Sequence, residues 1–248
     1  MQRVTRLAAR LLDVRRTGRR LAIPAGDDAP RTLAEAYAVQ AAVTAGLGEM
    51  VGGYKVGLSP DGSGVFAPIH RSGVVKTGAS YAARPFDRVG IELELAFRFA
   101  RQVSGTALPS AVLDAIDAVF VAIELCETRY TTNDGVAKLT ALADHQFNRG
   151  VVLGTELKFD RTADYRGAAS RWLLDGKPTL EKQASHPNGD PMAPLGVLPR
   201  LLAERGRAIE PGQVVITGSL NGLTWAPVGT QVEGVVDGFG RVAVAIAA

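Results

Sequence analysis

One run of eleven residues constrains the fold more than any other part of the sequence. From Val89 to Phe99, apolar side chains alternate with polar or small ones, and Glu92 and Glu94 belong to the second set. Because side chains on a strand point alternately to opposite faces, this pattern predicts a strand with both glutamates on one face. Two carboxylates so placed repel each other, and a divalent cation between them would remove the repulsion.

A second strand-like run, residues 119–129, carries an isolated acid. Glu124 lies there among apolar neighbours, where a carboxylate is costly unless it is paired or bound to a metal. Three glutamates on two strands would form a hard oxygen site that suits Mg²⁺ or Mn²⁺. The expected metal ligands are therefore Glu92, Glu94 and Glu124. The three histidines lack the His-x-x-x-His spacing of a zinc site.

The composition is that of an ordinary globular enzyme. Of 248 residues, 46% are apolar and 21% are charged, and no run approaches the length of a membrane span. The single cysteine, Cys126, excludes an internal disulfide, and no secretory signal is visible. We expect a cytoplasmic protein with one catalytic domain over residues 1–248, made of a helical N-terminal segment, 1–50, and a strand-rich body, 51–248.

The remaining patterns predict helices at the start and strands in most of the later sequence. Thr32 and Glu35 have the spacing of a capping box, Ser110 is expected to cap a helix, and residues 171–177 are typical of a hairpin. Helices are expected at residues 5–20, 32–47, 111–118 and 194–205. Strands are expected around Lys55 and Glu124 and at residues 89–99, 151–160, 213–217, 230–236 and 241–247. This order predicts an α+β fold.

Positive charge is concentrated at the N-terminus. Residues 1–31 contain eight arginines and three aspartates, a local charge of +5 within a net charge of +3. Such a run usually marks a solvated helix face, and the aromatic residues that accompany a nucleic-acid site do not come after it. A basic-helix binding protein is the non-enzyme alternative. An organellar transit peptide is disfavoured because the segment has no serine.

Six stretches occur in an order that resembles one enzyme family. They are Gly53–Leu58, Ile91–Glu94, Ala122–Glu124 with Arg129, Ala143–Asp144, Val152–Gly154 and Val215–Ser219. On these residues the chain resembles the 2-keto-4-pentenoate hydratases and 2-oxo-acid decarboxylases of the fumarylacetoacetate hydrolase superfamily. The resemblance implies a mixed β-roll of the fumarylacetoacetate hydrolase type, with the N-terminal helices packed outside.

The resemblance also implies roles for individual residues. Lys55 matches a lysine that faces the substrate, where a cation could hold a carboxylate or polarise an enolate. The expected acid/base groups are Asp144, His70 and His145. The expected substrate contacts are Ser219, Arg129 and Leu58. From the residues alone, His145 and Ser219 could equally be ordinary loop residues, and Arg129 could pair with Glu127 or Asp134.

Three departures from the family pattern leave the reaction open. His145 stands where the family usually has asparagine, and no acid lies near Pro68, where the hydratases tend to have one. His70 could replace that acid. The segment 182–186 also departs from the glycine-rich family sequence.

We expect a lyase of aromatic catabolism that adds water to a 2-hydroxy-2,4-dienoate or 2-oxo-enoate and gives a 4-hydroxy-2-oxo acid. A 2-oxo-acid decarboxylase and an acylpyruvate-type C–C hydrolase remain alternatives, because all three reactions use an enolate. The expected cofactor is Mg²⁺ or Mn²⁺, and the expected partner is a small 2-oxo acid, without nucleic acid or membrane. A homo-oligomer is expected, and a complex with a sister enzyme of the pathway is left open.

Overall fold

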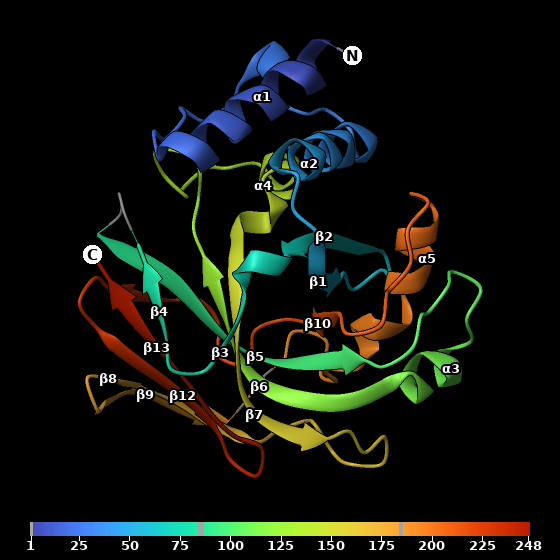
Figure 1. Cartoon of the computed structure of the whole chain (residues 1–248), viewed down its shortest axis with the longest axis vertical. Coiled ribbons are helices and arrows are strands. Elements are labelled where there is room, and N and C mark those ends of the chain that lie inside the picture. Colours follow the sequence, from blue (N-terminus) through green and yellow to red (C-terminus); the bar gives the residue numbers. More distant parts are fainter. Residues whose placement is uncertain (1, 84–86, 184–185) are drawn as a thin grey trace.

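Two sheets and a group of helices at one end make up the protein (Figure 1). The computed structural model describes residues 2–83, 87–183 and 186–248. Helices α1 (Gln2–Thr17) and α2 (Leu33–Leu47) lie together over the short helix α4 (Lys138–Ala143). The mixed arrangement confirms the α+β class.

The N-terminal helices form where the sequence predicts them. α1 begins and ends three residues earlier than expected and buries Leu7, Ala8, Leu11 and Val14. Thr32 caps α2, because its hydroxyl accepts a hydrogen bond from the Glu35 N–H at 3.1 Å. α2 ends at Gly48, which adopts the left-handed conformation. Within the described residues, no helix is both long and apolar enough to cross a membrane.

The larger sheet contains eight strands and curls strongly. The strand order is β2-β1-β10-β5-β6-β7-β3, and β11 also pairs with β5. Its two edges, β2 and β3, are consecutive in the chain, since only the 3₁₀ turn Arg71–Gly73 separates them. The sheet must therefore bend until its edges approach each other. The strands are β1 (Val51–Leu58), β2 (Gly64–His70), β3 (Val74–Lys76), β5 (Arg88–Phe99), β6 (Ile116–Cys126), β7 (Asn148–Lys158), β10 (Val214–Ile216) and β11 (Thr224–Pro227).

Each face of the curled sheet has its own core. Ile69 of β2, Phe120 of β6 and Val151 of β7 belong to one small buried cluster, so their common face is the inside of the curl. Glu92, Glu94 and Ala96 lie on this same face because strand residues two apart point the same way. The outer face is apolar and packs against the second sheet. There Leu93 and Trp172 both lie so close to Gly234 that a Cβ on this glycine would meet them.

The smaller sheet has five strands in the order β4-β13-β12-β8-β9. They are β4 (Ala79–Ala82), β8 (Ala169–Leu174), β9 (Lys177–Gln183), β12 (Gln231–Val236) and β13 (Gly240–Ala247). The β8–β9 hairpin is confirmed, and Asp175 and Gly176 form its turn with positive φ angles of 51° and 74°. At Gly154 of β7 the two sheets come so close that a Cβ would meet the carbonyl of Arg241.

Two helix predictions are wrong in their bounds, and one helix is missed. Helix α3 covers Pro109–Asp114 rather than 111–118, with Leu108 and not Ser110 at its N-cap. The chain leaves it because β6 starts at Ile116 and pairs with both β5 and β7. Helix α5 covers only Leu198–Ala203, after a 3₁₀ turn at Ala193–Gly196. Helix α4, Lys138–Ala143, has no counterpart among the expected helices. The assignment of residues 1–248 to one domain stays a prediction.

Candidate active site

The sheet register brings two of the three glutamates side by side. Glu92 of β5 pairs directly with Glu124 of β6, and Glu94 pairs with Ala122. All three carboxylates thus occupy the inner face near one end of the curl. Glu124 is fully buried, Glu94 is 1% exposed, and Glu92 is half-buried.

Lys55 on β1 reaches across to this acidic group. Its Nζ donates to both carboxylate oxygens of Glu124, at 2.7 and 2.8 Å, and it lies 3.5 Å from the carbonyl oxygen of Gln146. The Lys55 side chain is only 16% exposed. A strand lysine that extends into the sheet interior is therefore part of the site and does not reach out to water.

Other polar groups hold the carboxylates in place. Asn148 donates from its side-chain amide to Glu124 at 2.8 Å, and the Gly218 N–H donates to Glu94 at 2.8 Å. The Cys126 thiol lies 3.6 Å from a Glu92 oxygen. Burial raises the pKa of Cys126 well above its usual value, so this group is a neutral donor.

The charges of the site do not balance within the described residues. Burial raises the pKa values of Glu92 and Glu94, and repulsion from Glu124 raises both further. Burial, the largest single influence, would lower the pKa of Lys55, but the neighbouring acidic groups, Glu124 foremost, together outweigh it and the Lys55 pKa is raised. One ammonium therefore faces three carboxylates.

This donor set fits a divalent cation. Ligand atoms of Glu92, Glu124 and Cys126 all lie within 4.8 Å of one another. Glu94 is turned toward the Gly218 N–H and is not part of that group. A divalent ion would offset the surplus negative charge, and carboxylate oxygens are the ligands that Mg²⁺ and Mn²⁺ prefer. The assignment of Glu92, Glu94 and Glu124 as ligands stays a prediction.

A left-handed turn shapes the wall opposite the carboxylates. His145, Gln146 and Phe147 have positive φ angles of 56°, 50° and 64°. Residues other than glycine rarely adopt this backbone conformation, so three of them in a row need support from their surroundings. The turn places the Gln146 carbonyl beside Lys55.

The buried side chains of Asp144 and His145 provide that support through contacts with neighbouring elements. Asp144 is fully buried and contacts Arg15 at 3.3 Å and Arg129 at 3.4 Å. Arg15 also donates to His145 Nδ1 at 3.0 Å. The Thr44 hydroxyl donates to the Gln40 carbonyl, so it accepts from His145 Nε2, at 3.1 Å. These contacts fix His145 as a neutral imidazole that holds the turn against α1 and α2.

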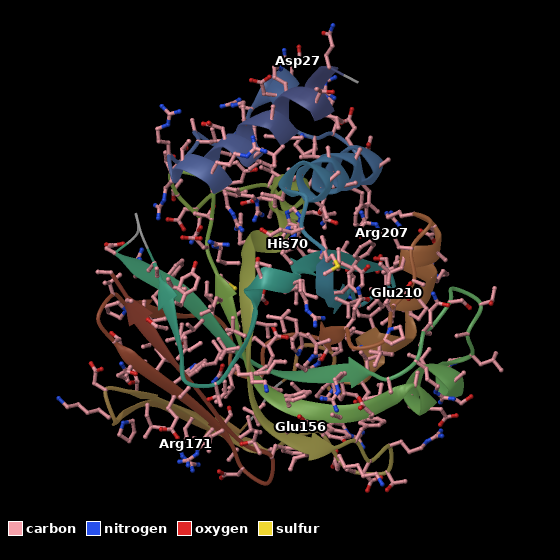
Figure 2. All side chains as sticks on the ribbon, viewed as in Figure 1. Asp27, His70, Glu156, Arg171, Arg207 and Glu210 are labelled. Carbon is pink, nitrogen blue, oxygen red and sulfur yellow. The ribbon has the colours of Figure 1, made fainter. Side chains whose placement is uncertain are left out.

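His70, the last residue of β2, lies against this buried group. Its ring centre lies 5.3 Å from that of His145, beneath the N-terminal helices (Figure 2). Burial, and next the charge of Arg15, lower the pKa of His70 to about 4. Neither ring nitrogen of His70 has a hydrogen-bond partner in the described part of the chain.

Two chambers open beside Lys55, Glu92 and Gln146, which line both. The glycine chamber has a volume of about 420 Å³ and is also lined by Gly57, Glu94, Pro187, Gly218, Ser219 and Gly222. The apolar chamber has a volume of about 540 Å³ and is lined mainly by Leu33, Val65, Leu139, Leu142, Phe147 and Leu223.

The predicted substrate contacts and acid/base groups are distributed unevenly around these chambers. Ser219 lines the glycine chamber, and its buried hydroxyl has no partner among the described residues. Arg129 is buried, where it pairs with Asp144 and donates to the Asn148 carbonyl at 2.6 Å. The Leu58 carbonyl accepts a hydrogen bond from the side-chain amide of Asn188. Among the residues described, those that line the two chambers include neither Arg129 nor Leu58, nor Asp144, His70 and His145.

Sequence reasoning overlooked three groups of the site. The Gln146 carbonyl and the Gly218 N–H belong to the main chain, so side-chain patterns give no signal for them. Asn148 does come after the Ala143–Asp144 stretch, and a polar residue at the start of a buried strand could have indicated its contact with Glu124.

Comparison with known proteins identifies the class of this α+β chain. The family model described as "Fumarylacetoacetate (FAA) hydrolase C-terminal" matches residues 59–247. The chain belongs to the fumarylacetoacetate hydrolase family, and the predicted family is confirmed.

Two curated relatives lie in the hydratase and decarboxylase branch. The chain is 28% identical over 231 residues to the TodF product hydratase of Pseudomonas putida, covering 87% of this chain and 84% of that protein. It is 25% identical over 153 residues to a 4-oxalocrotonate decarboxylase from a Pseudomonas species, covering 61% and 58%.

Solved structures confirm the expected fold. The 4-oxalocrotonate decarboxylase from Pseudomonas putida G7, complexed with magnesium and adipate, superposes with a TM-score of 0.87 at 21% identity, covering 99% of this chain and 97% of that chain. A fumarylpyruvate hydrolase from Pseudomonas aeruginosa, in complex with Mn²⁺ and pyruvate, gives 0.55 at 17% identity, covering 78% and 88%. The curled mixed sheet with outer N-terminal helices is thus the fumarylacetoacetate hydrolase fold.

Proposed function

We propose that this enzyme is a metal-dependent lyase that hydrates a 2-hydroxy-2,4-dienoate to a 4-hydroxy-2-oxo acid. The observation that carries the proposal is the set of two buried carboxylates and one half-buried carboxylate with one ammonium, placed where two chambers meet. A divalent ion held by Glu92, Glu94 and Glu124 would supply Lewis-acid stabilisation of negative charge on the 2-oxygen.

The chain's own groups orient the substrate. The unpartnered Ser219 hydroxyl can donate to the 1-carboxylate in the glycine chamber. Lys55 Nζ, at the junction of the chambers, places a positive charge beside the oxygen that becomes enolate. The fold around Glu124 excludes water and strengthens these interactions.

The proposed reaction has two steps. The 2-hydroxyl loses a proton and C5 gains one, which gives a 2-oxo-3-enoate. Water then bonds through oxygen to C4 while C3 takes up a proton. Decarboxylation and C–C hydrolysis use the same enolate, and the similarity to a decarboxylase keeps the first of these as the principal alternative.

The products distinguish these reactions. The protein is incubated with Mg²⁺ and, separately, 2-hydroxypenta-2,4-dienoate, 2-oxohex-3-enedioate and an acylpyruvate, and products are identified by NMR. We expect a 4-hydroxy-2-oxo acid from the dienoate. Carbon dioxide from the enedioate, or pyruvate and a free acid from the acylpyruvate, would replace hydration by the corresponding alternative.

The metal site is tested independently of turnover. A calorimetric titration with Mn²⁺ is expected to show one binding site. Glu124→Gln should lower the Mn²⁺ affinity of this site by at least about tenfold, because a charged ligand is lost. Glu156→Gln is the matched control. Glu156 lies near the end of β7 that is remote from Asn148 and the site, where it pairs with Arg98 (Figure 2). Equal Mn²⁺ affinity in both variants would contradict the ligand assignment.

The non-enzyme alternative has little support. Six arginines of the N-terminal run form ion pairs with acids of the same chain, namely Arg3, Arg6, Arg10, Arg15, Arg19 and Arg31. Such pairing leaves less charge for phosphates than the sequence suggests. The homo-oligomer and the cytoplasmic location stay predictions.

A further inference from the structure

The apolar chamber exposes hydrocarbon surface that the described chain does not cover. Among the described residues, four large apolar side chains are exposed, and two of them, Leu33 at 43% and Leu223 at 48%, line this chamber. Leu33 comes from the start of α2 and Leu223 from the loop before β11, so distant segments converge on one apolar space. Concave apolar surface next to a reactive group is typical of a ligand site.

The two chambers give a bound molecule a direction. Both share Lys55, Glu92 and Gln146, whereas only the glycine chamber contains Ser219 and Glu94. A 2-oxo acid with its polar head in the glycine chamber would pass Lys55 and extend its far end into the apolar chamber. The volume of about 540 Å³ exceeds what the last carbons of a five-carbon dienoate would fill.

The charges of the apolar chamber disfavour a second carboxylate on the substrate. Of the described residues that line it, Lys55 is already paired with Glu124, and Lys138 is exposed at the first position of α4. Glu92 adds negative charge. A distal carboxylate would lose its hydration among Val65, Leu139 and Leu142 without gaining a buried partner.

We propose that the apolar chamber binds an uncharged alkyl or aryl tail, so that the preferred substrates are monocarboxylic 2-oxo acids with several carbons beyond C5. This proposal rests on the proposed function, because it assumes that the 2-oxo acid head occupies the glycine chamber. It adds the chemical class of the tail, which the carboxylate site does not determine.

Saturated 2-oxo acids test the tail without turnover. Dissociation constants are measured by calorimetry with the full chain and Mg²⁺ for pyruvate, 2-oxopentanoate, 2-oxoheptanoate and 2-oxoadipate. We expect affinity to rise roughly fourfold for each methylene that enters the chamber, and therefore about fifteenfold from 2-oxopentanoate to 2-oxoheptanoate. We expect 2-oxoadipate to bind no more tightly than 2-oxopentanoate.

A charge placed in the chamber should reverse this preference. In Leu223→Lys we expect weaker binding of 2-oxoheptanoate, because an ammonium replaces apolar surface, and tighter binding of 2-oxoadipate, because this second ammonium adds to the charge of Lys138, which alone stays hydrated. Leu33→Lys, at the start of α2, is the second variant if the first folds poorly. The matched control is Leu108→Lys, since Leu108 is 70% exposed and lies before α3, outside the chamber.

The outcomes separate this proposal from the function on which it rests. If pyruvate binds but added methylenes do not tighten binding, or if 2-oxoadipate binds most tightly, the tail proposal alone is overturned. If none of the four acids binds, the 2-oxo acid function fails, and the tail proposal fails with it. The same response in Leu108→Lys and Leu223→Lys would also count against the chamber.

Discussion

Lys55 supplies the positive charge of the site and lies where the two chambers meet. It is the only cation within hydrogen-bond distance of Glu124 in the described residues, and both chambers reach it. Removing one partner of a buried ion pair leaves an uncompensated charge, which is more damaging than losing a surface pair.

Lys55→Met is expected to lower kcat/KM by about a hundred- to a thousandfold, because the charge beside the enolate oxygen is lost. Without metal it should also destabilise the protein by about 3 kcal/mol, since Glu124 stays buried and unpaired. Added Mg²⁺ should restore much of the Tm but not the activity. Lys76→Met, at an exposed position of β3, is the control. Wild-type kcat/KM in Lys55→Met would remove Lys55 from the mechanism.

His70 makes stability depend on pH in a defined window. Its pKa is lowered from 6.5 to about 4 in the folded protein, first by burial. Between these values the unfolded chain binds more protons than the folded one, so stability is present above about pH 6.5 and is lost as the pH falls toward 4. His145, with a pKa also lowered by burial, acts in the same direction.

His70→Gln should therefore flatten the acid side of the stability profile. The difference in Tm between wild type and variant, measured from pH 7.5 to 4.5, isolates this group because other titrations cancel. We expect the wild type to lose several degrees relative to the variant on acidification. A difference that does not change with pH would show that His70 is not a buried neutral imidazole.

At the scale of elements, alternation predicts strands better than it predicts short helices. Val89 to Phe99 alternates because one face packs and the other carries the acids, and this strand appears with nearly the predicted bounds. Helix α4 has only six residues, too few for a clear helical period. The left-handed turn after it has no glycine, so its conformation comes from tertiary contacts of Asp144 and His145 that no local pattern encodes.

Helix α1 is tied to that turn by one arginine. Arg15 is 8% exposed and contacts both Asp144 and His145. Arg15→Leu should cost roughly 2–4 kcal/mol, because a buried carboxylate loses one of its two arginines. Arg19→Leu removes an exposed pair with Asp13 and should cost less than about 1 kcal/mol. Urea unfolding of both variants measures the contrast, and equal losses would mean that Arg15 is not a structural link.

At the scale of the whole molecule, the two sheets meet through residues without side chains. A Cβ on Gly154 would meet the carbonyl of Arg241 and lie 2.8 Å from that of Val121. Both obstacles are backbone atoms, so a larger residue must push the sheets apart.

Gly154→Ala should destabilise the protein by about 3 kcal/mol, at the upper end of overpacking effects. Gly196→Ala is the matched control, because a Cβ there meets nothing within 4 Å. Thermal unfolding of the two variants gives the comparison. Equal Tm values would show that the approach of the sheets is not tight in solution.

The placement of Leu33 on an outer helix has a consequence for how such enzymes diversify. The acids and Lys55 belong to the curled sheet, whereas α2 lies outside both sheets and still reaches the mouth of the apolar chamber. Under the proposal for the apolar chamber, substitutions on α2 should alter which carbon skeleton is accepted while the acids and Lys55 stay unchanged. A duplicated copy of the gene could thus acquire a new growth substrate through changes on one helix, without passing through an inactive ancestor.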